Sequence, residues 1–116
     1  MEKKYDLEER TFIFAKDVRL FIMKLPKTLA NIEDCKQLVR ASGSVGANYI
    51  EANEALSKKD FIVRIKISRK EAKESRYWLK LINIGGNTEL EEERDKHIHE
   101  STELMNIFGA ILKKSK

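Results

Sequence analysis

The chain has 116 residues and a mass of 13.5 kDa, a size that predicts one domain over residues 1–116. Apolar residues make up 41% and charged residues 36% of the sequence, a balance that argues against a disordered tail and against a membrane protein. One cysteine and an N-terminus without the apolar run of a signal peptide indicate a cytoplasmic protein, and the net charge is +4.

The first helix is expected over residues 7–25, with Asp6 as its N-cap and Pro26 ending it. Apolar residues at three- and four-residue steps form its core-facing seam, namely Leu7, Phe14, Val18, Phe21 and Leu25. Further apolar side chains flank this seam at Phe12, Ile13, Leu20 and Ile22. Because this apolar surface is wider than one bundle requires, we expect these four residues to contact another subunit.

The second helix is expected to begin after Asn31 as its N-cap and to continue to Leu56. Its seam contains Cys35, Leu38, Ser42, Val45, Tyr49, Ala52 and Leu56. The middle of this segment, residues 41–47, is made of small residues, and each of its glycines costs about 1 kcal/mol of helix propensity relative to alanine. Close approach of another backbone would compensate for that cost, so we expect tight helix packing here.

Two more helices complete the chain. Ser57 is the expected cap of the third helix, which continues to Ile84 and ends at Gly85 and Gly86. A capping box at residues 88–91 starts the fourth helix, whose seam contains Leu90, His97, Ser101, Leu104, Phe108 and Ile111. Four helices with short loops predict an all-α fold, an antiparallel up-down-up-down four-helix bundle.

Positive charge is concentrated on the third helix. Residues 57–84 contain nine basic and three acidic residues, so this segment supplies more than the whole net charge of +4. At about 100° per residue, six of these cations lie within an arc of roughly 120° opposite the seam, and we call them the basic stripe: Lys66, Arg69, Lys70, Lys73, Arg76 and Lys80. Such a stripe is either a solvated helix face or a phosphate-binding surface. A membrane surface is a third reading, but the opposite face is needed for the core. Tyr77, at the edge of the stripe, offers a ring on which a base can stack.

The sequence contains no complete catalytic motif. It has no Glu-x-x-His, which di-iron bundles need, and no phosphate-binding glycine loop. His97 and His99 fall on different helix faces, and we interpret His97 as a core histidine with a hydrogen-bonding partner and Cys35 as a small buried hydrophobic residue. We therefore expect no enzymatic activity, no cofactor and no metal site. The least favoured alternative is an enzyme built on the carboxylates of Glu51, Glu71 and Glu74.

Several polar residues lie close to the seams of the second and third helices. Their pattern predicts a structural polar layer that fixes helix register, formed by Gln37, Arg40, Asn48, Glu51 and Glu71. A buried carboxylate requires a cationic or hydrogen-bonding partner. We therefore expect Arg40 to be mostly buried and bonded to Glu51 or Glu71.

Two segments carry a family resemblance. Residues 37–52 (QLVRASGSVGANYIEA) and residues 61–79 (FIVRIKISRKEAKESRYWL) resemble the second and third helices of a bacterial four-helix-bundle family, named for proteins encoded in intervening sequences of 23S ribosomal RNA genes. The matching motif positions are Gln37, Arg40, Ser44, Asn48 and Glu51. The resemblance implies a homopentamer without established enzymatic activity. It also implies a relation to the accessory variability proteins of diversity-generating retroelements, which act with a reverse transcriptase and nucleic acid.

Two functional hypotheses follow. The first is a non-catalytic oligomer that binds the phosphate backbone of RNA or DNA through the basic stripe. The alternative is a protein-interaction or assembly module, for example a reverse transcriptase accessory protein, that does not bind nucleic acid directly. In both, copies meet through apolar surface left outside the core, which on the third helix comprises Val63, Ile67, Trp78 and Leu81.

Overall fold

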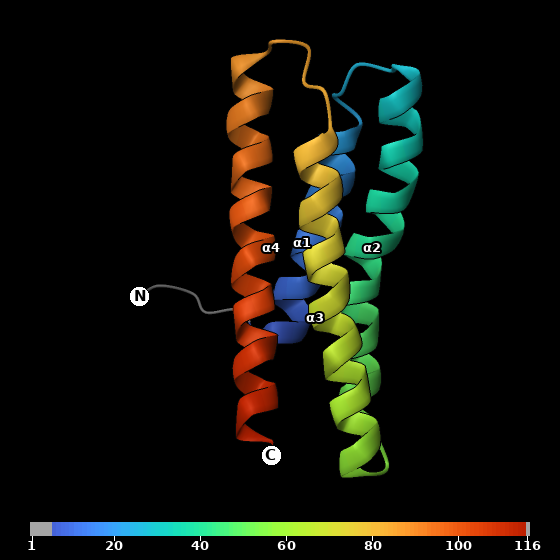
Figure 1. The fold of residues 1–116 in the computed structure, drawn as a ribbon, viewed down its shortest axis with the longest axis vertical. Helices are drawn as coiled ribbons and strands as arrows, with labels where there is room; N and C mark the ends of the chain where they lie inside the picture. The colour runs from blue at the N-terminus through green and yellow to red at the C-terminus, as the bar shows by residue number, and fades with distance from the viewer. Residues whose placement is uncertain (1–5, 116) are drawn as a thin grey trace.

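The computed structural model describes residues 6–115, which form four helices: α1 (Leu7–Ile22), α2 (Leu29–Asn53), α3 (Lys58–Leu81) and α4 (Thr88–Lys114). Successive helices run in opposite directions, so the chain passes up and down the bundle twice (Figure 1). Each of α1 and α3 packs against both α2 and α4. The expectation of an all-α, four-helix fold is confirmed.

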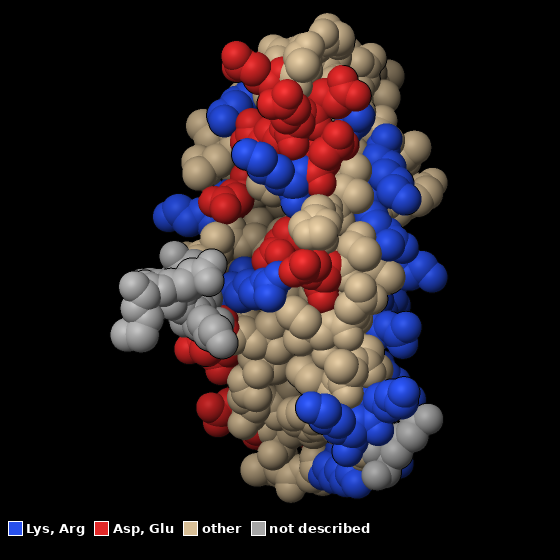
Figure 2. Space-filling view, turned by 90° about the vertical axis from the view of Figure 1, so that its left-hand side faces the viewer, with Lys and Arg blue, Asp and Glu red and all other residues tan. Residues whose placement is uncertain are grey.

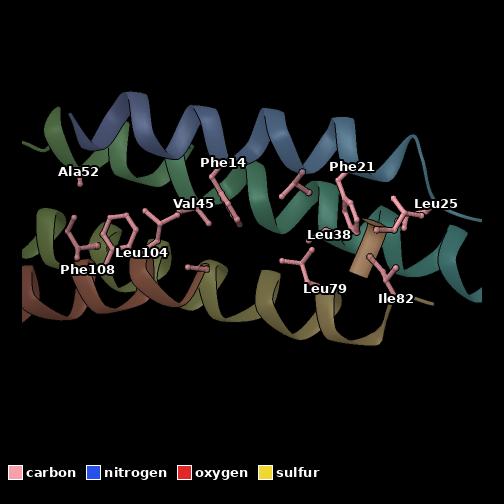
Figure 3. Close-up of a cluster of buried hydrophobic side chains, with 14 residues drawn as sticks. Phe14, Phe21, Leu25, Leu38, Val45, Ala52, Leu79, Ile82, Leu104 and Phe108 are labelled. Atoms are coloured by element: carbon pink, nitrogen blue, oxygen red, sulfur yellow. The ribbon is translucent and has the colours of Figure 1, made fainter. Parts of the chain in front are cut away.

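The core is a continuous cluster of apolar side chains from all four helices (Figure 3). Its fully buried members include Val18, Phe21, Leu38, Val45, Ile65, Leu79, Leu104 and Phe108. Burial of each large apolar side chain contributes about 1.5–3 kcal/mol to the free energy of folding, so this cluster is the main source of stability. The predicted seams are confirmed along most of their length, but Leu56 is 98% exposed and was wrongly placed in the core.

The ends of α1 and α2 differ from the predicted ones. Helix α1 ends at Ile22 instead of Leu25, because the chain tightens into i→i+3 bonds from the Lys24 and Leu25 amides before Pro26. Thr28 caps α2, its side chain accepting a hydrogen bond from the Asn31 amide at 3.1 Å. Helix α2 also ends earlier than expected, at Asn53.

Asn31 ties two loops together instead of capping a helix. Its side-chain nitrogen donates to the Pro26 carbonyl at 2.9 Å and to the Asn83 carbonyl at 2.8 Å. Its side-chain oxygen accepts from the Asn83 amide at 3.0 Å. Asn31 is 2% exposed, and these three bonds join the α1–α2 loop to the α3–α4 loop at one end of the bundle.

The α3–α4 connection is longer than the sequence predicted. Helix α3 ends at Leu81, and Ile82 takes an extended conformation that buries its side chain against the core. Gly85 and Gly86 have φ angles of 67° and 75°, the left-handed region expected of glycines at this turn. Asn87, not Thr88, is the N-cap of α4 and accepts from the Leu90 amide at 3.1 Å.

The predicted close packing of α2 occurs at Gly46. A β-carbon there would lie only 2.8 Å from the Thr11 hydroxyl oxygen of α1, and Thr11 is 1% exposed. At Gly43 the nearest atom is the flexible tip of Arg19, at 3.1 Å. The tight contact between α1 and α2 therefore depends on one glycine, Gly46, and the absence of its side chain.

Helix α1 is shorter than its neighbours, with 16 residues against 24–27 in the others. Helix α1 begins short of the α2–α3 turn, so the first turns of α3 extend beyond it (Figure 1). Within residues 6–115, no helix is both long and apolar enough to cross a membrane.

Candidate nucleic-acid interface

The basic stripe lies on the outer side of α3. Five of its six cations are exposed, and the sixth, Arg76, is half-buried and donates to the Thr102 hydroxyl at 3.3 Å. Within residues 6–115, none of the six lies within 4.0 Å of a carboxylate oxygen. Other cations of the protein do find such partners: Arg10, for example, contacts Glu100 at 2.7 Å and Glu103 at 2.6 Å.

The charges of α3 are sorted onto different sides of the helix. Its acidic residues are Asp60, Glu71 and Glu74; Asp60 lines a groove with α2, and the two glutamates bond to Arg40 of α2. The stripe's outer arc contains no carboxylate. Figure 2 shows the result from the side of α4: Lys and Arg follow the right-hand edge, where α3 lies, and Asp and Glu gather at the top.

Two further cations, Lys58 and Lys59, fall within the same arc of α3. Lys59 is exposed and lies seven residues before Lys66, two helical turns down the same side of α3. With it, the positive face extends from Lys59 to Lys80, about 31 Å at 1.5 Å per residue. The signal that finds both cations is the same helical period that defined the stripe.

The polar layer is centred on a fork between Arg40 and two glutamates. Arg40 donates from one nitrogen to Glu71 at 3.0 Å and from another to Glu74 at 3.2 Å. The Glu71 side chain is 7% exposed, whereas that of Arg40 is 53% exposed. The expected bond to Glu71 is present, but the expectation of a mostly buried Arg40 was wrong, because its long side chain reaches Glu71 from the surface of α2.

The two carboxyl groups of this fork differ in acidity. Burial is the main cause that raises the pKa of Glu71, and a hydrogen bond with Glu74 raises it further. That hydrogen bond is also the main cause that lowers the pKa of Glu74. The second oxygen of Glu71, Oε1, is buried without a hydrogen-bond donor. Burial therefore makes Glu71 the weaker acid of the two.

The other members of the predicted polar layer lie apart from the contact between Arg40 and Glu71. Asn48 bridges α2 and α3: its oxygen accepts from Arg64 at 3.1 Å and its nitrogen donates to the Ser44 carbonyl at 2.9 Å. Gln37 and Glu51 are exposed and have no part in the contacts around Arg40 and Glu71. Glu51 also lies eleven residues beyond Arg40, about 16 Å along α2, so the three carboxylates of the enzyme hypothesis do not converge.

The histidines and the cysteine occupy separate environments. His97 packs on Phe21 with ring centroids 5.2 Å apart, and burial lowers its pKa. Its Nε2 is buried and has no hydrogen-bond partner within residues 6–115, so the predicted partner was wrong. His99 is exposed and lies 3.2 Å from Glu103. Cys35 is half-buried against the core, and burial raises its pKa, as fits a small hydrophobic residue.

Two grooves flank α2, a mainly apolar one on the side of α1 and a more polar one on the side of α3. The α1–α2 groove has a volume of about 580 Å³, and its lining includes Phe12, Leu20 and Ile50, which are 64%, 50% and 49% exposed. The α2–α3 groove, about 390 Å³, is lined in part by Leu56, Val63 and Ile67. Of the other residues expected at a subunit interface, Leu81 is exposed, whereas Ile13, Ile22 and Trp78 are half-buried. Ile22 and Trp78 pack against the core.

Comparisons with known proteins extend over nearly the whole chain. A family model described as 23S rRNA-intervening sequence protein matches residues 3–110. A crystal structure of a protein of unknown function from the S23 ribosomal protein family of Bacteroides thetaiotaomicron is similar, with a TM-score of 0.78 and 30% sequence identity. That similarity covers 93% of this chain and 99% of the other. No curated protein matches the sequence.

Proposed function

Since the chain belongs to the family of 23S rRNA-intervening sequence proteins, we propose that it is a non-catalytic, oligomeric bundle that binds the phosphate backbone of nucleic acid through the basic stripe. The observation that carries the proposal is the sorting of charge on α3. Six cations share one outer face without a carboxylate partner in residues 6–115. Clustered Lys and Arg side chains gain free energy on a polyanion because condensed counterions are released.

A purely solvated helix face is expected to look different. Faces that only keep a protein soluble interleave both signs of charge, so that the cations have carboxylate neighbours on the same helix. On α3 the two glutamates nearest the stripe are bonded to Arg40 of α2. The charge of the stripe is therefore left for an external anion.

Salt dependence is the direct test. If the six cations each neutralise one phosphate, the logarithm of the association constant should fall with the logarithm of salt concentration with a slope of about −4 for single strands. Filter binding to RNA and DNA at several salt concentrations measures this slope. A flat response, or no binding at low salt, would contradict the proposal.

Assembly of several copies is part of the same proposal. The two grooves flanking α2 differ in shape and lining, so a contact between one groove of a copy and the other groove of its neighbour would be heterologous. Heterologous contacts close into rings when the rotation fits. The number five comes from the family resemblance, and a ring would present several basic stripes to one polyanion, raising the apparent affinity.

The mass in solution tests the assembly. Light scattering during gel filtration is expected to give a multiple of 13.5 kDa at micromolar concentration, five-fold for a homopentamer. Leu20→Glu should shift the protein toward the monomer, because Leu20 is half exposed in the α1–α2 groove and a charge there opposes its burial. A mass of 13.5 kDa for the unmodified chain would defeat this part of the proposal.

A second candidate function is favoured by the same grooves. An assembly module would use them to bind a protein partner, such as a reverse transcriptase, while the basic stripe contacts an acidic surface or only solubilises the particle. Neither candidate assigns a reaction, a cofactor or a metal to the chain, and both place it in the cytoplasm. Reversing the charge of the basic stripe distinguishes the two candidate functions.

A further inference from the structure

Tyr77 lies inside the basic stripe. It is 57% exposed, and its neighbours one turn away on the same face are Lys73 below and Lys80 above, with Lys70 two turns below. The helical period therefore places an aromatic ring in the path that a phosphate backbone would follow. The sequence had placed this ring only at the edge of the stripe.

The ring of Tyr77 is held in place from behind. It meets the ring of Trp78 edge to face, with centroids 5.0 Å apart and an angle of 76° between the planes. Trp78 is half-buried and packs against the core, so it fixes the position of Tyr77 without enclosing it. In such an edge contact at least one face of the Tyr77 ring is not covered by Trp78.

The shape of the surface disfavours a duplex as the partner. Helix α3 packs along its length against α2 and α4, and this broad helical surface fits poorly into a major groove about 12 Å wide. A duplex could therefore touch the stripe only with its backbone, and its stacked bases would offer nothing to Tyr77. An unpaired strand offers both a phosphate backbone and free base faces.

We infer that the outer face of α3 binds single-stranded nucleic acid, with the phosphates on the basic stripe and one base stacked on Tyr77. This inference rests on the proposed function and specifies the form of nucleic acid. Recognition is independent of sequence, because every base has a face that can stack.

The test combines removal of the ring with removal of the bases. Two strands of equal length are compared, oligothymidine and an abasic deoxyribose-phosphate strand that keeps the charge but lacks the bases. Tyr77→Ala is expected to weaken oligothymidine binding about tenfold and to leave the abasic strand and the salt slope unchanged. Tyr77→Phe keeps the ring and should bind like the unmodified protein. An oligouridine arm shows whether the same ring serves RNA.

Two results would overturn the inference while leaving the proposed function intact. One is oligothymidine binding by Tyr77→Ala equal to that of the unmodified protein. The other is a matched duplex that binds as tightly as oligothymidine and loses as much affinity on the same substitution. Absence of binding to every strand at low salt would instead reject the proposed function itself, and the inference with it.

Discussion

Reversing three lysines of the basic stripe, by Lys66→Glu, Lys70→Glu and Lys73→Glu, is expected to weaken nucleic-acid binding by on the order of 100-fold at low salt. The substitutions remove half of the six cations that face the backbone and add three repulsive charges. All three side chains are exposed, so the core is untouched. Filter binding at fixed salt, with circular dichroism to check helix content, measures the effect.

The matched control changes net charge by the same amount elsewhere. Lys27, Lys36 and Lys96 are exposed and lie outside α3, and replacing all three with glutamate also takes the net charge from +4 to −2. We expect the control to lose far less affinity, because binding depends on the stripe. Equal losses in both variants would show that overall charge alone is responsible. If the stripe variant still binds nucleic acid but no longer captures a protein partner, the assembly module is the better description.

Arg40→Ala is expected to lower the free energy of unfolding by about 2 kcal/mol at neutral pH. It removes two charge-assisted hydrogen bonds and leaves the buried Glu71 without its cation. A fully buried pair would cost about 3–5 kcal/mol, but the Arg40 side chain is 53% exposed, and solvent screening reduces the effect. Urea unfolding of the purified variant measures the loss.

The effect of Arg40→Ala should depend on pH. The pKa of Glu71 is raised in the folded protein, so stability falls as pH rises from the ordinary value of 4.5 through the folded value. Without Arg40 the pKa of Glu71 rises further, which enlarges the loss of folding stability in this pH range. The pKa of Glu74 is lowered, mainly by its hydrogen bond with Glu71 and also by Arg40, so the stability from these contacts is present above 4.5 and is lost as pH falls through its folded value. The variant should therefore approach the unmodified protein in acid.

Glu71→Gln provides the control for this prediction. Glutamine keeps the size of the side chain and cannot ionise. We expect this variant to be close to the original in stability at neutral pH and to make a second substitution, Arg40→Ala, much less costly. A loss in Arg40→Ala that is constant from pH 4 to pH 8 would show that packing, not charge, is responsible.

The sequence was sufficient for the helices and their buried faces, because a 3.6-residue period is a local property. Helix ends were less predictable where two residues competed for one role. Both Thr28 and Asn31 can cap α2, and the choice depends on Asn83, more than 50 residues away, which occupies the Asn31 side chain. The same limit applies to Arg40, since a helical position gives the direction of a side chain but not its reach.

The candidate site, too, was predictable from the sequence only in part. The stripe follows from helical spacing alone, and so does Lys59 once the period is extended. The predicted interface residues did not fall on one surface, because apolar residues on opposite flanks of a helix face different neighbours. Phe12 lies in the groove with α2, whereas Val63 lies in the groove on the other side of α2. Such grooves exist only once helices are packed.

The short helix α1 also determines how the molecule opens. The end with the α2–α3 turn extends beyond the start of α1 and lacks that helix as a packing partner, so amide protons there should exchange with solvent through partial unfolding at a lower free energy. The upper half of α3, from Lys73 to Lys80, belongs to the four-helix part that stays closed. A molecule that has lost its lower end to such a fluctuation still presents Lys73, Tyr77 and Lys80 on an intact helix, so opening of the bundle need not release a bound strand.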